Sequence, residues 1–121
     1  MNANQKTKRP VNSHKAYHAH VYFDDDTKSL AREVCETAGE MFGLRVGRFH
    51  EKLVGPHPCW SCQITFGTKD FEHFIAWLDE NRKGLAVLVH ALTGDDLKDH
   101  TEFAYWLGDA VDLNLEVFGE T

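Results

Sequence analysis

Two histidines at alternate positions are the first sign of chemistry in this sequence. In residues 17–23, the alternation of a β-strand places His18, His20 and Tyr22 on one face and apolar side chains on the other. Imidazole is the commonest metal-binding side chain in proteins, and it also carries protons near neutral pH. The pair predicts half of a metal site, or else two histidines of a surface network, because a metal needs a third and usually a fourth ligand.

Other histidines could supply those ligands. The chain contains eight, and His50, His57, His90 and His100 fall in or near segments that are expected to form strands, strand-edge loops or a helix start. His73 is expected on the solvated side of a helix, where such residues are mostly exposed. This distribution favours a functional site over scattered surface histidines.

Length and composition describe an ordinary globular domain. The chain has 121 residues, of which 42% are hydrophobic and 26% charged. No apolar run approaches the ~20 residues that cross a bilayer, and a formal net charge of -6 disfavours a nucleic-acid partner. Residues 1–14 are expected to be a flexible tail without a secretory signal, and residues 15–121 a single domain. A cytoplasmic location and a small-molecule ligand follow as expectations.

The three cysteines favour no redox site. Cys59 and Cys62 form a C-x-x-C pair, but Pro58 precedes it and a strand is expected to follow, so the helix N-terminus that lowers a redox thiol's pKa is missing. A zinc knuckle would need a second pair, and the sequence holds none, although histidines could substitute. We expect Cys35, Cys59 and Cys62 to be reduced residues of the core or sheet.

Hydrophobic periodicity and turn residues predict four strands and three helices. The strands are expected over residues 16–23, 43–51, 60–66 and 85–92, and the helices over 27–42, 70–81 and from Asp95 or Asp96 to Leu107. Residues 54–58 carry two prolines and a glycine and should form a loop. A short extended tail is expected at residues 113–115.

This order of elements predicts an α+β fold of the ferredoxin-like βαββαβ type with a C-terminal helix. Helices on the Ala19 side would leave a polar, histidine-rich face opposite, to which the fourth strand adds either His90 with Leu88 or Val87 with Val89. The end of that strand should lie near His18, because the first strand is expected to run antiparallel beside it. An uncovered sheet face commonly packs on a partner, which predicts a barrel-like homodimer that encloses a cavity.

Five ordered blocks of sequence resemble the DOPA 4,5-dioxygenase family. They are His18–Phe23, Gly55–Pro58, Gln63, Trp77–Leu85 and Val89–His100. The resemblance extends from about Tyr17 to Leu113, and Ala91-Leu92 departs from the family's usual residues before Thr-Gly. It implies a ferredoxin-like domain, often dimeric, that cleaves a catechol ring with O2 at non-haem iron.

That activity implies roles for residues on the polar face. Fe(II), or zinc or another divalent ion in purified protein, would be held by His18, His20, His57 and His90, three as ligands and the fourth acting nearby. A three-histidine site is one alternative, and a site completed by Asp95 or Glu51 is the other. The remaining roles are acid-base catalysis by His50 and His100 and substrate binding by Arg48, Gln63 and Tyr22.

Two other functions fit the same residues. One is a non-enzymatic module that binds a metal or a small ligand, which would hold zinc with no open coordination position. The other is a cofactor-free oxygenase or isomerase that uses the histidines as bases and stays active after chelation.

Overall fold

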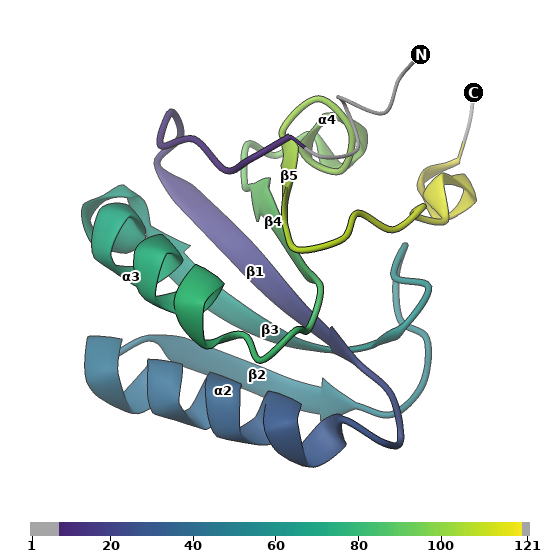
Figure 1. Cartoon of the computed structure of the whole chain (residues 1–121). Helices are drawn as coiled ribbons and strands as arrows, with labels where there is room; N and C mark the ends of the chain where they lie inside the picture. The colour runs from purple at the N-terminus through teal and green to yellow at the C-terminus, as the bar shows by residue number, and fades with distance from the viewer. Residues whose placement is uncertain (1–7, 120–121) are drawn as a thin grey trace.

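A five-stranded antiparallel sheet forms the middle of the fold. The computed structural model describes residues 8–119, and the strand order is β2-β3-β1-β4-β5 (Figure 1). The strands are β1 (Ala16–Phe23), β2 (Arg45–His50), β3 (Trp60–Gly67), β4 (Val87–Ala91) and β5 (Ala104–Leu107). The helices are α2 (Lys28–Phe42), α3 (Thr68–Asn81), the short α4 (Asp96–Asp99) and the 3-10 helix η1 (Leu115–Phe118). The elements from β1 to β4 have the predicted βαββαβ order of a ferredoxin-like fold.

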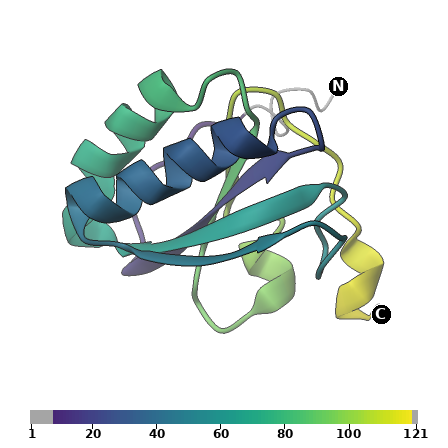
Figure 2. The same ribbon diagram turned by 90° about the horizontal axis from the view of Figure 1, so that it is seen from below.

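Both long helices cover one face of the sheet, and the main core lies between them and the strands (Figure 2). Ala19 and Val21 of β1 face this core and are fully buried, as their alternation predicts. The buried residues of the helices recur every three or four positions, as an amphipathic helix requires. They are Ala31, Val34, Cys35 and Ala38 in α2 and Phe71, Phe74, Ile75 and Leu78 in α3.

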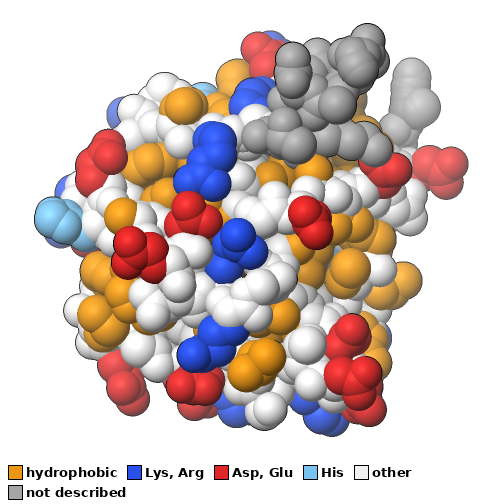
Figure 3. Space-filling model, in the orientation of Figure 1, with side chains coloured by type: hydrophobic (Ala, Val, Ile, Leu, Met, Phe, Trp, Pro, Cys, Tyr) orange, Lys and Arg blue, Asp and Glu red, His pale blue; other side chains and the backbone are white. Residues whose placement is uncertain are grey.

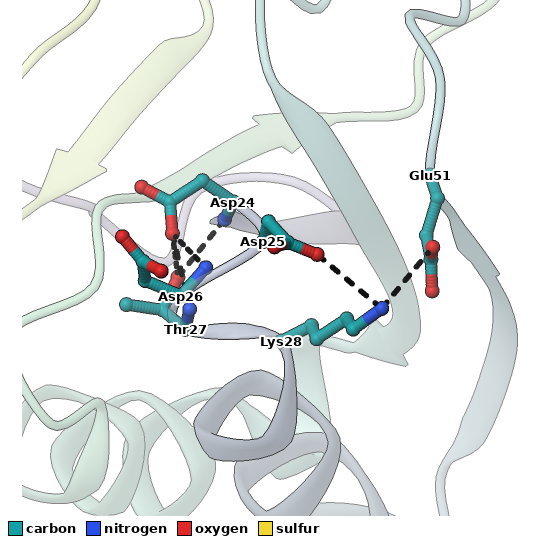
Figure 4. A network of polar contacts seen from close by, with 6 residues as sticks. All are labelled: Asp24, Asp25, Asp26, Thr27, Lys28 and Glu51. Atoms are coloured by element: carbon teal, nitrogen blue, oxygen red, sulfur yellow. Dashed lines mark hydrogen bonds and ion pairs between the residues drawn. The ribbon is translucent and has the colours of Figure 1, made fainter.

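A polar turn fixes the start of α2 (Figure 4). The Asp24 carboxylate accepts hydrogen bonds from the main-chain N–H of Asp26 and Thr27 and from the Thr27 hydroxyl. Lys28 then bridges Asp25 and Glu51, with Nζ 3.5 Å from a carboxylate oxygen of each. Asp24 thereby closes the turn before α2, whereas Thr27 at the N-cap makes no side-chain capping hydrogen bond to the helix. The same network ties the β1–α2 turn to the end of β2.

The opposite face of the sheet carries the histidines and a second, smaller cluster of buried side chains. Tyr22, Leu88, Ala104 and Trp106 make up that cluster. Because His20 pairs with Leu88 and His18 with His90 across β1 and β4, Leu88 and His90 share this face. One of the two predicted alternatives for the fourth strand is thereby confirmed. Helices α4 and η1 lie on this side (Figure 2).

The end of the chain differs from the sequence prediction. The expected helix from Asp95 or Asp96 to Leu107 is wrong, because α4 ends at Asp99 and residues 104–107 form β5. Residues 104–107 are hydrophobic, two of the four are aromatic, and they pair with the otherwise open edge of β4 from Val87↔Leu107 to His90↔Ala104. The expected extended tail at 113–115 is also wrong: residues 110–114 have no regular structure and η1 follows.

A β-bulge in β2 decides which of its side chains face the histidines. Val46 pairs with Ile64 and Phe49 with Cys62, so β2 has one more residue than β3 in this interval. Val46 therefore packs against the main core, whereas Arg48 and His50 border a pocket on the histidine face. The simple alternation in the sequence predicts one face for all three, and the bulge breaks that alternation.

Residues 8–14 lie against the edge of the sheet and against α3. The Trp106 N–H donates to the Lys8 carbonyl at 2.8 Å, and Arg9 pairs with Asp79 at 2.8 Å. Residues 1–7 of the predicted tail lie outside the described part of the chain. His14 packs on Phe103 with 4.6 Å between ring centroids.

Acidic and basic side chains are interspersed over the helix-covered side (Figure 3). Among residues 8–119, no helix has the length and apolar character that a bilayer crossing needs. Cys35 and Cys62 are buried in the core, Cys59 is half-buried, and all three are free thiols.

Candidate metal centre

Three histidines of the two central strands converge on the face opposite the long helices. β1 pairs with β4 in a register that sets His18 directly opposite His90, and His20 lies two residues further along β1. Alternation brings all three side chains to one face. One nitrogen of each ring lies within 4.8 Å of the other two, and among the described residues this is the group whose ligand atoms could hold a metal ion.

The spacing of these nitrogens suits direct coordination. The Nε2 atoms of His20 and His90 are 3.0 Å apart. Two imidazole nitrogens that each lie about 2.1 Å from one ion, at right angles to each other, are separated by about 3.0 Å. Three histidines leave coordination positions open, as a metal that binds both substrate and O2 requires. The donor set therefore fits Fe(II), and it also fits zinc.

A main-chain hydrogen bond orients His90 for this role. Its Nδ1 lies 2.9 Å from the Ala91 carbonyl oxygen, which only accepts hydrogen bonds, so Nδ1 carries the ring proton. Nε2 is then left with its lone pair facing His20. Metal-binding histidines commonly donate their second N–H in this way, because it fixes both tautomer and ring orientation.

Burial and mutual repulsion keep these rings neutral. His20 and His90 are 5% and 3% exposed. Burial lowers the pKa of His20 well below its ordinary value, and neighbouring histidines, His57 first, add to the effect. Burial together with the charge of His100 lowers the pKa of His90 to about 3. Neutral imidazoles are the form that binds metal, so the site is ready at neutral pH.

The metal-free protein should lose stability in mild acid. The pKa values of His57 and His90 are lowered to about 4 and about 3. The unfolded chain takes up protons near pH 6.5 while the folded chain does not, so their contribution is full above that pH and falls as the pH decreases. Between pH 7 and pH 5 the free energy of unfolding should fall by about 2 to 4 kcal/mol. Urea titrations at both pH values would measure it, and equal midpoints would contradict it.

His57 lies beside this group but is not part of it. Its ring centroid is 4.1 Å from that of His20, and its Nδ1 is 2.8 Å from the Tyr22 hydroxyl. Burial raises the pKa of Tyr22, so that hydroxyl keeps its proton. The loop between β2 and β3 carries His57, and a main-chain bond from the Asn114 N–H to the Pro56 carbonyl, at 2.8 Å, holds that loop.

His100 comes to the cluster from the end of α4. Its ring centroid lies 4.1 Å from that of His90 and 4.8 Å from that of Phe118. His100 Nδ1 is 2.8 Å from the Asp96 carbonyl oxygen, so Nδ1 donates and Nε2 has a free lone pair. The buried Asp99 carboxylate accepts hydrogen bonds from the Thr93 N–H and hydroxyl and so fixes the loop that leads into α4.

A pocket of about 200 Å³ opens beside the cluster. His20 and His57 form one side of it. Arg48, His50, Ser61 and Gln63 from β2 and β3 also line it, together with Gly47, Val54 and Gly55. The structure thus gathers His50, Arg48 and Gln63, which the sequence predicts as functional, around one small cavity. Arg48 is exposed at the sheet edge, and Gln63 is half-buried.

Neither predicted carboxylate joins the three histidines. Glu51 pairs with Lys28 on the outside of the sheet. The Asp95 carboxylate accepts from the Lys98 N–H and so caps α4. Of the two alternatives drawn from the sequence, the three-histidine site is the one that this geometry supports. His73 is exposed on α3, as predicted.

Sequence reasoning missed the contacts that arise from the end of the chain. Phe118, which lies beside His100, and Asn114, which binds Pro56, both follow the region where a helix was expected. The Asn114 contact is a main-chain bond and has no side-chain signature. Sequence reasoning also missed the buried Asp99. It stands next to His100 in the sequence and accepts hydrogen bonds from Thr93.

Two curated proteins are similar to this chain in sequence. A protein of Botryotinia fuckeliana without assigned function is 35% identical over 114 residues, and a DOPA 4,5-dioxygenase of Amanita muscaria is 30% identical over 110 residues. Each alignment covers 84% of this chain, but the chain spans only 62% and 48% of the length of these two curated relatives.

A solved structure shares the fold. The crystal structure of a candidate dioxygenase from Nostoc punctiforme superposes with a TM-score of 0.83 at 41% sequence identity, covering 86% of this chain and 90% of that one. Residues 17–117, which contain all the elements of the histidine cluster, match the Dopa 4,5-dioxygenase family. The chain therefore belongs to the Dopa 4,5-dioxygenase family.

Proposed function

We propose that this protein is a ring-cleaving dioxygenase that opens catechol-type substrates with O2 at a histidine-bound Fe(II). The observation that carries the proposal is the group of His18, His20 and His90, with two Nε2 atoms 3.0 Å apart, beside a pocket large enough for one aromatic ring. The named activity of the Amanita muscaria relative supports it. When bound, the iron would hold the two catechol oxygens and activate O2.

The first task of the protein is to remove a proton from the catechol, and His100 is placed for it. Its Nδ1–H donates to the Asp96 carbonyl, so the Nε2 lone pair is free to accept a proton. The His100 ring packs directly against the ring of His90, which belongs to the metal group. A histidine at this position suits general-base catalysis because an imidazole nitrogen with a free lone pair can accept the proton of a nearby hydroxyl.

The second task is to hold or return a proton on the other side, and His57 is placed for that. The Tyr22 hydroxyl donates to His57 Nδ1 in our assignment, which puts the ring proton on Nε2. Nε2–H can then donate to an oxygen of the substrate or product. Tyr22 acts in this scheme through His57, as a positioning residue, and not on the substrate itself.

The small pocket would hold the aromatic ring. Gln63 can orient a hydroxyl, and Arg48 can pair with a carboxylate at the pocket mouth. His50 borders the same pocket and lies close enough to His57 for its charge to lower the pKa of that ring further. We assign His50 to the pocket wall, as a secondary acid-base group.

Anaerobic loading with ferrous iron followed by L-DOPA and air tests the proposal. We expect stoichiometric O2 uptake and a yellow product, because ring opening inserts both oxygen atoms and extends conjugation. Iron chelation should abolish uptake. The matched control is His73→Ala, an exposed substitution on α3 that should change neither rate nor metal content.

The alternatives give different results in the same experiment. Uptake that survives chelation would support a cofactor-free oxygenase. Tightly bound metal without uptake on L-DOPA, catechol or 4-methylcatechol would support a binding module. Either result would overturn the proposed function.

The predicted homodimer remains part of the proposal. The same chain already covers part of the histidine face, through α4, the 110–118 segment and the loop before β3 (Figure 2). A partner sheet would therefore meet only the uncovered remainder of this face. Sedimentation at equilibrium measures the mass directly.

A further inference from the structure

A second and larger cavity lies on the other side of His100. Its volume is about 540 Å³, within the range of sites that bind drug-sized molecules. Trp106 and Ala104 of β5 form its floor, and Val111, Leu113 and Leu115 of the C-terminal segment form a wall. Nothing in the proposed chemistry uses this space.

His100 stands between this cavity and the metal group. His100 lines it, and the His100 ring is 4.1 Å from the ring of His90. On the other side, the His100 ring centroid is 6.3 Å from that of His57, which lines the small pocket. A molecule whose ring lies at the metal could therefore extend past His100 into the larger space.

The character of the lining favours an apolar occupant. The wall side chains are apolar, and Trp106 is 5% exposed. The charged residues of the lining have both signs, Lys8 against Glu102 and Asp112, and Thr101 adds a hydroxyl, so no single charge would select an ionic group. Lys8 Nζ already donates to the Glu102 carbonyl and lies over the Tyr105 ring, 5.0 Å from its centroid.

We propose that this cavity is the subsite for an apolar substituent on the ring, so that the preferred substrates are catechols with an alkyl or aryl extension. The inference rests on the proposed function for its substrate class, but the binding that it predicts needs neither metal nor O2. Each methylene group removed from water stabilises binding by about 0.8 kcal/mol, which is about fourfold in affinity.

The test uses 4-alkylphenols from methyl to butyl and the metal-free full-length chain. No metal is present and the phenol end is the same throughout the series, so the change in affinity with chain length reports the cavity. Trp106 lines the cavity floor, and its fluorescence should change on binding, whereas Trp106→Phe should lose that signal. We expect Kd to fall about fourfold per added methylene until the cavity is filled.

Substitutions in the cavity wall test whether the alkyl chain binds there. Val111→Phe should weaken butylphenol at least tenfold and leave methylphenol unchanged, because the added ring fills part of the cavity that only the longer chain reaches. Leu113→Ala should reduce the gain per methylene. Leu30→Ala, an exposed leucine on the helix side, is the matched control and should bind like the unaltered protein. Circular dichroism confirms that each variant is folded.

Three outcomes would overturn the subsite: affinity that does not depend on chain length, an unchanged series in Val111→Phe, or tighter binding of phenols with a carboxylate or ammonium end than of alkylphenols of equal length. The proposed function fails separately. If alkylphenols bind as expected but iron-loaded protein consumes no O2 with 4-alkylcatechols, the cavity is a binding site and the oxygenase is wrong.

Discussion

Replacing His90 with alanine is expected to empty the metal site and abolish O2 uptake. His90 contributes an Nε2 that lies 3.0 Å from its counterpart on His20, and its tautomer is fixed by the Ala91 carbonyl. Losing a partner that only orients a ligand already costs 10–100-fold in affinity, so loss of the ligand itself should cost more than about 100-fold. Metal analysis after dialysis against ferrous iron, together with oxygen electrode traces, measures both effects.

The same result is expected for the other two members of the group. His18→Ala and His20→Ala should lose metal as His90→Ala does, and His73→Ala should retain it. Unfolding curves are needed beside the metal analysis, because His90 is buried and its removal leaves a cavity. If any one of the three alanine variants keeps stoichiometric iron after dialysis, the assignment of that histidine as a ligand is wrong.

The second large effect is expected at His57, in the rate and not in the metal content. His57→Gln should lower kcat by about 100-fold or more, because a positioned proton donor typically contributes 10²–10⁴-fold. Iron content should be unchanged, since no His57 nitrogen belongs to the three-ligand group. Rapid mixing of iron-loaded protein with substrate and O2 gives kcat and KM separately.

Tyr22→Phe separates positioning from direct participation. It removes the hydroxyl that lies 2.8 Å from His57 Nδ1 and leaves the His57 ring in place. We expect kcat to fall about tenfold with little change in KM, the size typical of a lost orienting partner. Loss of iron in His57→Gln would instead make His57 a ligand, and a large rise in KM in Tyr22→Phe would make Tyr22 a substrate contact.

Much of the fold follows from local patterns. Alternation in β1 correctly separates Ala19 and Val21 from the histidines, because one buried face fixes the register of a strand. Antiparallel pairing of β1 with β4 then brings His90 opposite His18, which is why two distant segments of sequence could be joined in one predicted site.

The differences come from features that local patterns do not encode. The run Ala104–Leu107 contains apolar residues that also suit a helix, and only the open edge of β4 makes it a strand. The bulge in β2 depends on pairing with β3, so alternation alone put Val46 on the wrong face. The larger cavity is built from three segments outside the βαββαβ unit, and no motif marks it.

The three histidine ligands and the wall of the larger cavity lie on parts of the chain that differ in how their backbone is held. His18, His20 and His90 lie on strands that are hydrogen-bonded on both sides, whereas the Val111 and Leu113 wall belongs to a segment without regular structure. Segments of the second kind open at low free-energy cost, while central strands open only near global unfolding, and amide hydrogen exchange reports both. Under the proposed function, local opening of the wall would let substrate and product pass while the three imidazoles keep their places.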